Sequence, residues 1–155
     1  MNQASSKTAM RVLVTGAGSG IGAGIAMNLA AQGHALLVTD LRLEAAETTA
    51  KAIKEAGGSA EARTLDVSSE ESIRALVDGL DSPVDVLVNN AGLQHVAPLE
   101  DFPMDKWNLL VQVMLVGVAR LSQALLPGMR EQGFGRIVNI GSINGLTYAP
   151  LENYS

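Results

Sequence analysis

The sequence predicts an α/β protein with a doubly wound parallel sheet. Short apolar segments rich in Val, Leu and Ile alternate along the chain with longer segments of helical composition. Of the 155 residues, 47% are hydrophobic but only 3% are aromatic, so the core must consist mainly of aliphatic side chains. Aliphatic segments suit strands buried on both faces, and the regular alternation favours helical crossovers between parallel strands.

Five apolar segments are expected to be strands. The first is a β-branched run that ends in glycines, and the second ends in Asp40. The third alternates in hydrophobicity, and the last two are short Val-, Leu- and Ile-rich runs that include asparagine. The expected strands span residues 11–15, 35–40, 60–66, 84–89 and 136–140.

The segments between these strands are expected to be helices. Gly33 and the pair Gly57-Gly58 follow the first two, where a helix C-terminus favours glycine. Ser68 and the acids after it resemble a capped helix start. Pro103 suits the first turn of the fourth helix, and Pro127-Gly128 is expected to break it. The expected helices span residues 20–31, 43–55, 68–80 and 103–126.

The chain is expected to form one domain over residues 11–155, preceded by a flexible polar tail over residues 1–10. The tail lacks the apolar segment of a secretory signal. No helix follows the last strand before Ser155, so we expect the C-terminal strands and helices of the fold to be missing from this chain. The apolar face around Ile137 and Asn139 would then be uncovered.

Composition argues against several classes of partner. The net charge is −5 with scattered Lys and Arg, which is unlike a nucleic-acid-binding surface. The longest apolar stretch, residues 109–119, is interrupted by Gln112 and Gly117 and is too short to span a bilayer. The chain has no cysteine, which is compatible with a cytoplasmic location. No metal site is expected.

A glycine-rich turn, residues 15–22, joins the first strand to the first helix. Gly16 permits the sharp turn, while Gly20 and Gly22 let a pyrophosphate and the helix approach closely. The helix N-terminus offers N–H groups and partial positive charge to phosphates. In this strand–turn–helix context the glycines predict a dinucleotide site. The expected cofactor contacts in the turn are Gly16, Ser19, Gly20, Ile21 and Gly22.

Asp40 ends the second expected strand, beyond the glycine turn. An acid at this place accepts hydrogen bonds from an adenosine ribose and repels a 2′-phosphate, which favours NAD over NADP. Arg42 is a competing feature, because a nearby arginine tolerates NADP. The alternative is that Asp40 is an ordinary solvated aspartate at a strand end.

The spacing Thr-Gly-x-x-x-Gly-x-Gly in the turn resembles the short-chain dehydrogenase/reductase family, and further segments share the resemblance. Asp66-Val67 is similar to the pair that meets the adenine, and Asn89-Asn-Ala-Gly92 to the motif that shapes the cofactor floor. The resemblance implies a Rossmann-type NAD(P)-binding domain, an oligomeric enzyme, and cofactor contacts from Asp66, Val67, Asn90, Ala91 and Gly92.

The same resemblance implies a catalytic pair, Ser142 and Tyr154. Ser142 follows the fifth expected strand, and Tyr154 lies 12 residues later. Hydride transfer at a carbinol carbon requires a proton to move at its oxygen, and a tyrosine with a free pKa of about 10 needs nearby positive charge to act as the base. In the family the serine hydroxyl holds the substrate oxygen, and a lysine four residues after the tyrosine supplies the charge. That lysine would fall at position 158, so we expect residues 1–155 alone to be inactive.

Another departure lies on the long helix. The family places an asparagine there to hold a water for proton relay, and this chain has Met114. A thioether cannot replace an amide donor, and Met114 is expected to be a helix core residue.

The segment after the fourth strand closely resembles the loop of D-3-hydroxybutyrate dehydrogenases, in which the residue matching Gln94 contacts the substrate carboxylate. Asn144 replaces the histidine of that subgroup, and Glu152 lies where a lysine would be expected, so the carboxylate clamp is weakened. His95 is interpreted as a loop residue. The expected substrate contacts are Gln94 and Asn144.

Two classes of function remain open. The first is an oxidoreductase that uses NAD and a small alcohol, ketone, hydroxy acid or keto acid, with D-3-hydroxybutyrate as one substrate reading. The second is a dinucleotide-binding module without turnover, which Met114 and the absent lysine favour and the pair Ser142 and Tyr154 disfavours.

Overall fold

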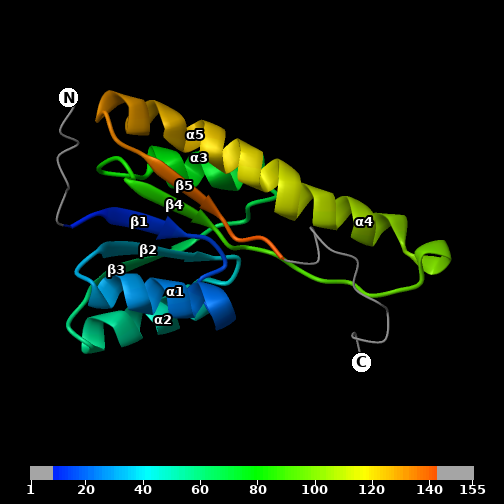
Figure 1. Cartoon of the computed structure of the whole chain (residues 1–155), viewed down its shortest axis with the longest axis horizontal. Coiled ribbons are helices and arrows are strands. Elements are labelled where there is room, and N and C mark those ends of the chain that lie inside the picture. Colours follow the sequence, from blue (N-terminus) through cyan, green and yellow to red (C-terminus); the bar gives the residue numbers. More distant parts are fainter. Residues whose placement is uncertain (1–8, 143–155) are drawn as a thin grey trace.

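The structure, a computed structural model, describes residues 9–142. Within this range the chain forms a parallel sheet of five strands in the order β3-β2-β1-β4-β5 (Figure 1). The strands are β1 (Arg11–Val14), β2 (Ala35–Asp40), β3 (Ser59–Thr64), β4 (Val86–Asn89) and β5 (Arg136–Asn139). The predicted doubly wound parallel sheet is confirmed, and every strand except the second is one or two residues shorter than expected.

Helices cover both faces of the sheet (Figure 1). α1 and α2 pack on one face, and α3 and α5 pack on the other. The helices are α1 (Gly20–Ala31), α2 (Leu43–Glu55), α3 (Glu70–Asp78), the short 3₁₀ turn η1 (Leu99–Asp101), α4 (Met104–Val111), the π-helical turn η2 (Gln112–Val116) and α5 (Gly117–Glu131). The expected crossover helices are therefore present in the expected order.

Alternation along each central strand divides the core into two layers. Val12 and Val14 of β1 pack against α1 and α2, whereas Leu13 between them packs against the α3 and α5 side. All three are buried. Because successive side chains on a strand point to opposite faces, an unbroken aliphatic run is what a sheet covered on both sides requires.

The expected helix over residues 103–126 differs from the structure in two ways. The π-helical turn η2 interrupts it, and it continues through Pro127 to Glu131 as α5. The expectation that Pro127-Gly128 ends the helix is therefore wrong. Leu121, Leu125 and Met129 lie on both sides of Pro127 and are buried in one core layer, so packing holds the helix across the proline despite the lost backbone hydrogen bond.

The continuous helical stretch Met104–Glu131 contains 28 residues and has a mean hydropathy of 1.8 in its most apolar window. By length and composition alone it could cross a membrane, and it is the one helix among residues 9–142 that could. The apolar helix is therefore longer than the stretch of residues 109–119 on which the sequence analysis based its statement about membranes.

β5 lies at one edge of the described sheet, and all four of its residues are exposed. Ile137 is 38% exposed and Val138 is 44% exposed. The expectation that apolar side chains of this strand are uncovered is confirmed for the described part of the chain.

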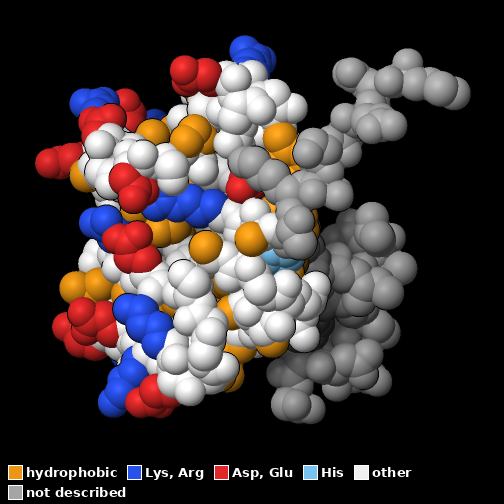
Figure 2. Space-filling model, turned by 90° about the vertical axis from the view of Figure 1, so that its left-hand side faces the viewer, with side chains coloured by type: hydrophobic (Ala, Val, Ile, Leu, Met, Phe, Trp, Pro, Cys, Tyr) orange, Lys and Arg blue, Asp and Glu red, His pale blue; other side chains and the backbone are white. Residues whose placement is uncertain are grey.

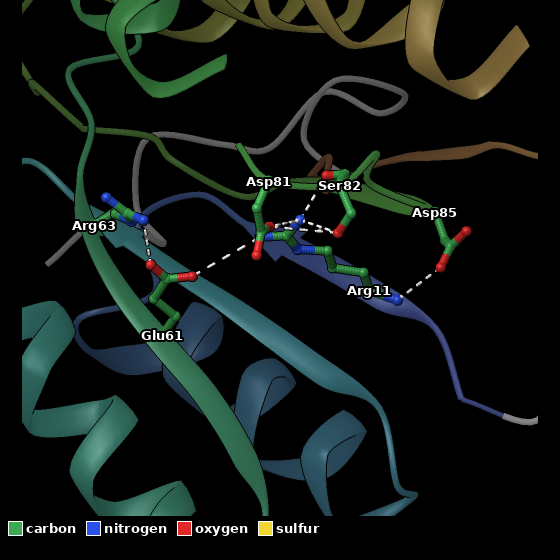
Figure 3. A network of polar contacts seen from close by, with 6 residues as sticks. All are labelled: Arg11, Glu61, Arg63, Asp81, Ser82 and Asp85. Atoms are coloured by element: carbon green, nitrogen blue, oxygen red, sulfur yellow. Dashed lines mark hydrogen bonds and ion pairs between the residues drawn. The ribbon is translucent and has the colours of Figure 1, made fainter. Parts of the chain in front are cut away.

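The amino ends of the strands are held by ion pairs and hydrogen bonds around Arg11 (Figure 3). Its guanidinium lies 2.6 Å from Asp81 Oδ1, donates to the backbone carbonyl of Ser82, and lies 3.9 Å from Glu61 on β3. The hydrogen bond from Arg11 and its positive charge lower the pKa of the exposed Asp81 carboxyl. The backbone N–H of Arg11 also donates to the buried Asp85 at 2.8 Å.

The side of the molecule to the left in Figure 1 is seen face-on in Figure 2. Basic and acidic side chains are interspersed over it, with hydrophobic atoms between them, and no single basic patch dominates this face. This arrangement agrees with the scattered charges of the sequence.

Candidate functional site

The expected site residues gather at the carboxyl edge of the sheet. The glycine turn follows β1, Asp40 ends β2, Asn90 follows β4 and Ser142 follows β5. β1 pairs with both β2 and β4, and β4 pairs with β5, so these four strand ends lie side by side. In open α/β sheets this edge is where ligands bind.

The glycines of the turn are required for different reasons. A Cβ on Gly22 would lie 2.3 Å from the Gly16 carbonyl oxygen and 2.4 Å from Asn90 Nδ2, so the helix could not approach the turn so closely. Gly16 has φ 61° and packs against Ala91, where a Cβ would lie 2.9 Å from the Ala91 Cα. Gly20 has φ 55°, but a Cβ there would meet nothing within 4 Å. The turn is therefore closed on the protein side and open at Gly20.

The start of α1 is left without a side-chain cap. Ser19 occupies the N-cap position, yet its side chain makes no capping hydrogen bond, and the first turn contains no acid. In α3, by contrast, the Ser69 side chain accepts from the Ser72 N–H at 3.2 Å. The first N–H groups of α1 thus have no side-chain partner and lie next to the open position at Gly20. These N–H groups and the partial positive charge of the helix N-terminus suit an anionic group such as a pyrophosphate.

Asn90 holds the turn together from β4. Its Nδ2 donates to the Thr15 carbonyl oxygen at 2.9 Å and to the Gly16 carbonyl oxygen at 3.1 Å. Thr15 Oγ1 in return accepts from the backbone N–H groups of Asn90 and Ala91, at 3.0 and 2.9 Å. The Asn90 amide is therefore engaged by protein carbonyls, and it fixes the backbone of the glycine turn.

Both carboxylate oxygens of Asp40 accept from backbone groups. The Gly18 N–H donates to Oδ2 at 3.0 Å, and the Arg42 N–H donates to Oδ1 at 3.1 Å. Asp40 therefore lies against the glycine turn, held by one backbone group of the turn and one of the segment after β2.

Asp66 and Val67 follow β3 at the same edge. Asp66 Oδ1 accepts from both the N–H and the hydroxyl of Ser68, at 2.9 and 2.6 Å. A Cβ on Gly117 would lie 2.5 Å from the Val67 carbonyl oxygen, so even alanine as the first residue of α5 would push the helix away from this segment. This close approach positions the Asp66-Val67 segment.

The loop after β4 carries Gln94 and His95. Gln94 is exposed, and the His95 ring packs edge-on against Phe102 with 5.2 Å between ring centroids. Phe102 in turn packs edge-on against Trp107 at 5.9 Å. His95 is thus a loop residue in the structure, and its ring takes part in a small aromatic cluster.

Met114 differs from the sequence-based expectation. It lies in the π-helical turn and is 52% exposed, so it is not a helix core residue. Its Cε would lie 3.9 Å from a Cβ on Gly92, which places its tip beside the Asn-Asn-Ala-Gly segment. The extra residue of the π turn changes which side chains face the core, and helical periodicity alone could not reveal this.

Ser142 is exposed and lies two residues beyond Ile140, whose N–H donates to the Asn89 carbonyl oxygen at 2.9 Å. The carboxyl end of β5 is further tied to β4 by the Asn89 side chain, which donates to Asn139 Oδ1 at 2.9 Å. Tyr154, Asn144 and Glu152 lie outside the described residues. Within residues 9–142 no group of three His, Cys, Asp or Glu side chains is arranged to hold a metal ion.

Sequence reasoning missed the part played by Thr15. It was noted only as the first letter of a motif, whereas its buried hydroxyl joins β1 to the segment after β4. A single hydroxyl at the end of an otherwise aliphatic strand was the available signal, because a buried polar group needs a partner.

A doubly wound parallel sheet, with a glycine turn and an uncapped helix start at its first crossover, defines an α/β protein of the Rossmann type. The family model for short chain dehydrogenase matches residues 10–155. The chain belongs to this family of oxidoreductases, as its motifs predicted.

Individual relatives agree with this assignment. The chain is 38% identical over 139 residues to a D-beta-hydroxybutyrate dehydrogenase of Cupriavidus necator, covering 86% of this chain and 53% of the relative. A gluconate 5-dehydrogenase from Burkholderia cenocepacia, solved with NADP and tartrate, is 38% identical with a TM-score of 0.85, over 91% of this chain and 56% of that one. An NAD+-bound xylitol dehydrogenase is 35% identical with a TM-score of 0.86, over the same shares of the two chains. The chain thus spans about half the length of the curated relatives that it matches.

Proposed function

We propose that this chain is the dinucleotide-binding part of an NAD-dependent oxidoreductase that acts on a small alcohol or ketone, or on a hydroxy or keto acid. The observation that carries the proposal is the uncapped N-terminus of α1 beside the open position at Gly20, with Asp40 fixed against the same turn. The nicotinamide cofactor, when bound, supplies or accepts the hydride. Solved relatives with NADP and with NAD+ support a cofactor of this class.

Different segments of the chain would bind different parts of the cofactor. The turn would hold the pyrophosphate through the backbone of Ser19, Gly20 and Ile21, with Gly16 and Gly22 allowing the turn to close. Asp40 would accept from the adenosine ribose, and Asp66 and Val67 would border the adenine. Asn90, Ala91 and Gly92 would form the floor beneath the nicotinamide side, with Asn90 acting through the carbonyl groups that it holds.

The proposed cofactor preference gives a first prediction. We expect the chain to bind NADH more tightly than NADPH, because a 2′-phosphate would lie against the Asp40 carboxylate, and we expect Asp40→Ala to reduce this preference by about tenfold. Fluorescence titration of both reduced cofactors measures the two dissociation constants. Arg42→Ala is the contrasting variant, because it removes the cation that would tolerate a 2′-phosphate without touching the carboxylate, and it should not reduce the preference for NADH. Equal or tighter binding of NADPH by the wild-type chain would contradict the proposal.

For catalysis we propose Ser142 and Tyr154, with Gln94 and Asn144 contacting substrate. The serine hydroxyl would hold the substrate oxygen, and the tyrosine would exchange a proton with that oxygen as hydride moves at the neighbouring carbon. The three relatives are dehydrogenases of hydroxybutyrate, gluconate and xylitol, all small hydroxylated molecules. Because Asn144 and Glu152 weaken a carboxylate clamp, we propose weak use of 3-hydroxybutyrate and better use of a neutral or differently shaped alcohol.

A second prediction concerns turnover. We expect residues 1–155 alone to form no NADH at a useful rate, and a longer chain with a lysine at position 158 to do so. In the longer chain, Ser142→Ala should lower kcat by about 10²–10⁴-fold, whereas Ser142→Thr, which keeps a hydroxyl, should lower it less. NADH formation is followed with a panel of alcohols that includes 3-hydroxybutyrate. Robust activity of the short chain, or 3-hydroxybutyrate as the best substrate, would refute the corresponding proposal.

The second candidate function is dinucleotide binding without turnover. Met114 favours it, because a thioether stands where the family has an amide that holds the relay water. Tight NADH binding by the longer chain, together with no activity on the whole panel, would select this alternative. For the complete protein we further propose a cytoplasmic homo-oligomer that binds neither nucleic acid nor membrane.

A further inference from the structure

Position 18 of the glycine turn lies directly against Asp40. The Gly18 N–H donates to Asp40 Oδ2 at 3.0 Å, and the Arg42 N–H donates to Oδ1 at 3.1 Å. The carboxylate is therefore held by two backbone groups from two different segments, the turn after β1 and the start of the crossover to α2. Two such contacts fix the orientation of a side chain that would otherwise rotate at a strand end.

Glycine is required at position 18 because of its neighbours. The backbone there does not have positive φ, so another residue could adopt the same conformation. A Cβ, however, would lie 2.5 Å from the Ala45 Cβ, 2.8 Å from Asp40 Oδ2 and 2.9 Å from Asp40 Cγ. Any side chain must therefore displace either α2 or the carboxylate.

The two backbone contacts leave the carboxylate able to bind a ligand. An ionised carboxylate has about four lone-pair directions, and two are used here, so each oxygen retains one for a ribose hydroxyl. We infer that Gly18 is a positioning residue for cofactor choice: its backbone N–H and its missing side chain hold the Asp40 carboxylate in the orientation that separates NADH from NADPH. This inference rests on the proposed function.

A displaced carboxylate would have two effects on the ligand. The ribose hydroxyls of NADH would lose a preoriented acceptor, and the 2′-phosphate of NADPH would no longer face a fixed negative charge. The exposed Arg42 side chain, two residues after Asp40 in the sequence, offers a positive charge near the same strand end. The ratio of the NADPH to the NADH dissociation constant should therefore change more than the average affinity for the two cofactors.

The test compares three variants of residues 1–155 with the wild-type chain. Gly18→Ala places the Cβ, Ala45→Gly removes the neighbouring methyl group without touching the carboxylate, and the double variant combines them. In the double variant the contact with Ala45 is relieved, so the added Cβ acts mainly on Asp40. Dissociation constants for NADH and NADPH are measured by fluorescence titration, and thermal unfolding reports on the fold.

We expect Ala45→Gly to keep the wild-type ratio of NADPH to NADH dissociation constants. We expect Gly18→Ala and the double variant to lower that ratio by about tenfold, the change that corresponds to losing one charge-assisted hydrogen bond. If Gly18→Ala does not fold, the double variant decides. An unchanged ratio in the double variant, including equal weakening of both cofactors, would overturn the inference and leave the proposed function intact. If the wild-type chain binds neither cofactor, the proposed function fails and this inference fails with it.

Discussion

Gly22→Ala is expected to destabilise the fold by several kcal/mol and to abolish NADH binding. The added Cβ would lie 2.3 Å from the Gly16 carbonyl oxygen and 2.4 Å from Asn90 Nδ2, so the helix must move away from the turn. Overpacking in a closed interior typically costs about 1–3 kcal/mol, and here it also breaks the hydrogen bonds that Asn90 makes to the turn. Urea unfolding and NADH titration measure the two effects.

Gly24→Ala is the matched control, two residues further along the same helix. A Cβ on Gly24 meets nothing within 4 Å, so the substitution should leave NADH binding unchanged. Replacing glycine by alanine inside a helix should also raise stability by about 0.5–1 kcal/mol. If Gly22→Ala and Gly24→Ala have the same free energy of unfolding and the same NADH affinity, the close contacts at Gly22 determine neither stability nor binding.

Thr15→Val is the second substitution with a large expected effect. Valine fills the same volume but removes the oxygen that accepts from the backbone N–H groups of Asn90 and Ala91. Thr15 is 1% exposed, and leaving a buried donor unsatisfied costs about 1–3 kcal/mol, so the loss of the acceptor for both N–H groups should cost about 2–6 kcal/mol. The free energy of unfolding in urea measures this loss directly.

The control for this substitution is Thr15→Ser, which keeps the hydroxyl and removes only a methyl group. We expect it to retain most of the stability that valine loses. NADH affinity should fall in Thr15→Val, because the floor segment after β4 loses its tie to the turn. A valine variant as stable as the serine variant would show that these N–H groups find other partners.

The general fold and the place of the site could be predicted because each depends on local pattern. Aliphatic runs such as residues 35–40 leave few alternatives to a doubly covered strand, and glycines between a strand and a helix are typical of one kind of turn. Once the strands are parallel, their carboxyl ends share one edge, so Asp40 and Asn90 had to lie near the glycine turn.

The remaining features depend on contacts between distant segments. Helical periodicity did not reveal that Pro127 is held inside α5 by buried neighbours on both sides, or that Met114 lies half-exposed in a π turn. The crowding of Gly18 by Ala45 involves residues from a turn and a helix that meet only in the folded chain. Such contacts leave no periodic signal, so packing decides them.

The π-helical turn η2 separates two helical stretches that differ in burial. In α5, Gly117, Leu121, Leu125 and Met129 are buried at four-residue spacing, whereas α4 has no buried residue. Each residue of a helix advances it by about 100°, so loss of one residue within 112–116 would turn α4 about its own axis by that amount relative to α5. Because α4 has no buried residue in the described structure, substitutions of its exposed side chains should change the free energy of unfolding little. The half-exposed side chain of Met114 should thus be replaceable with little effect on the core layer that α5 covers.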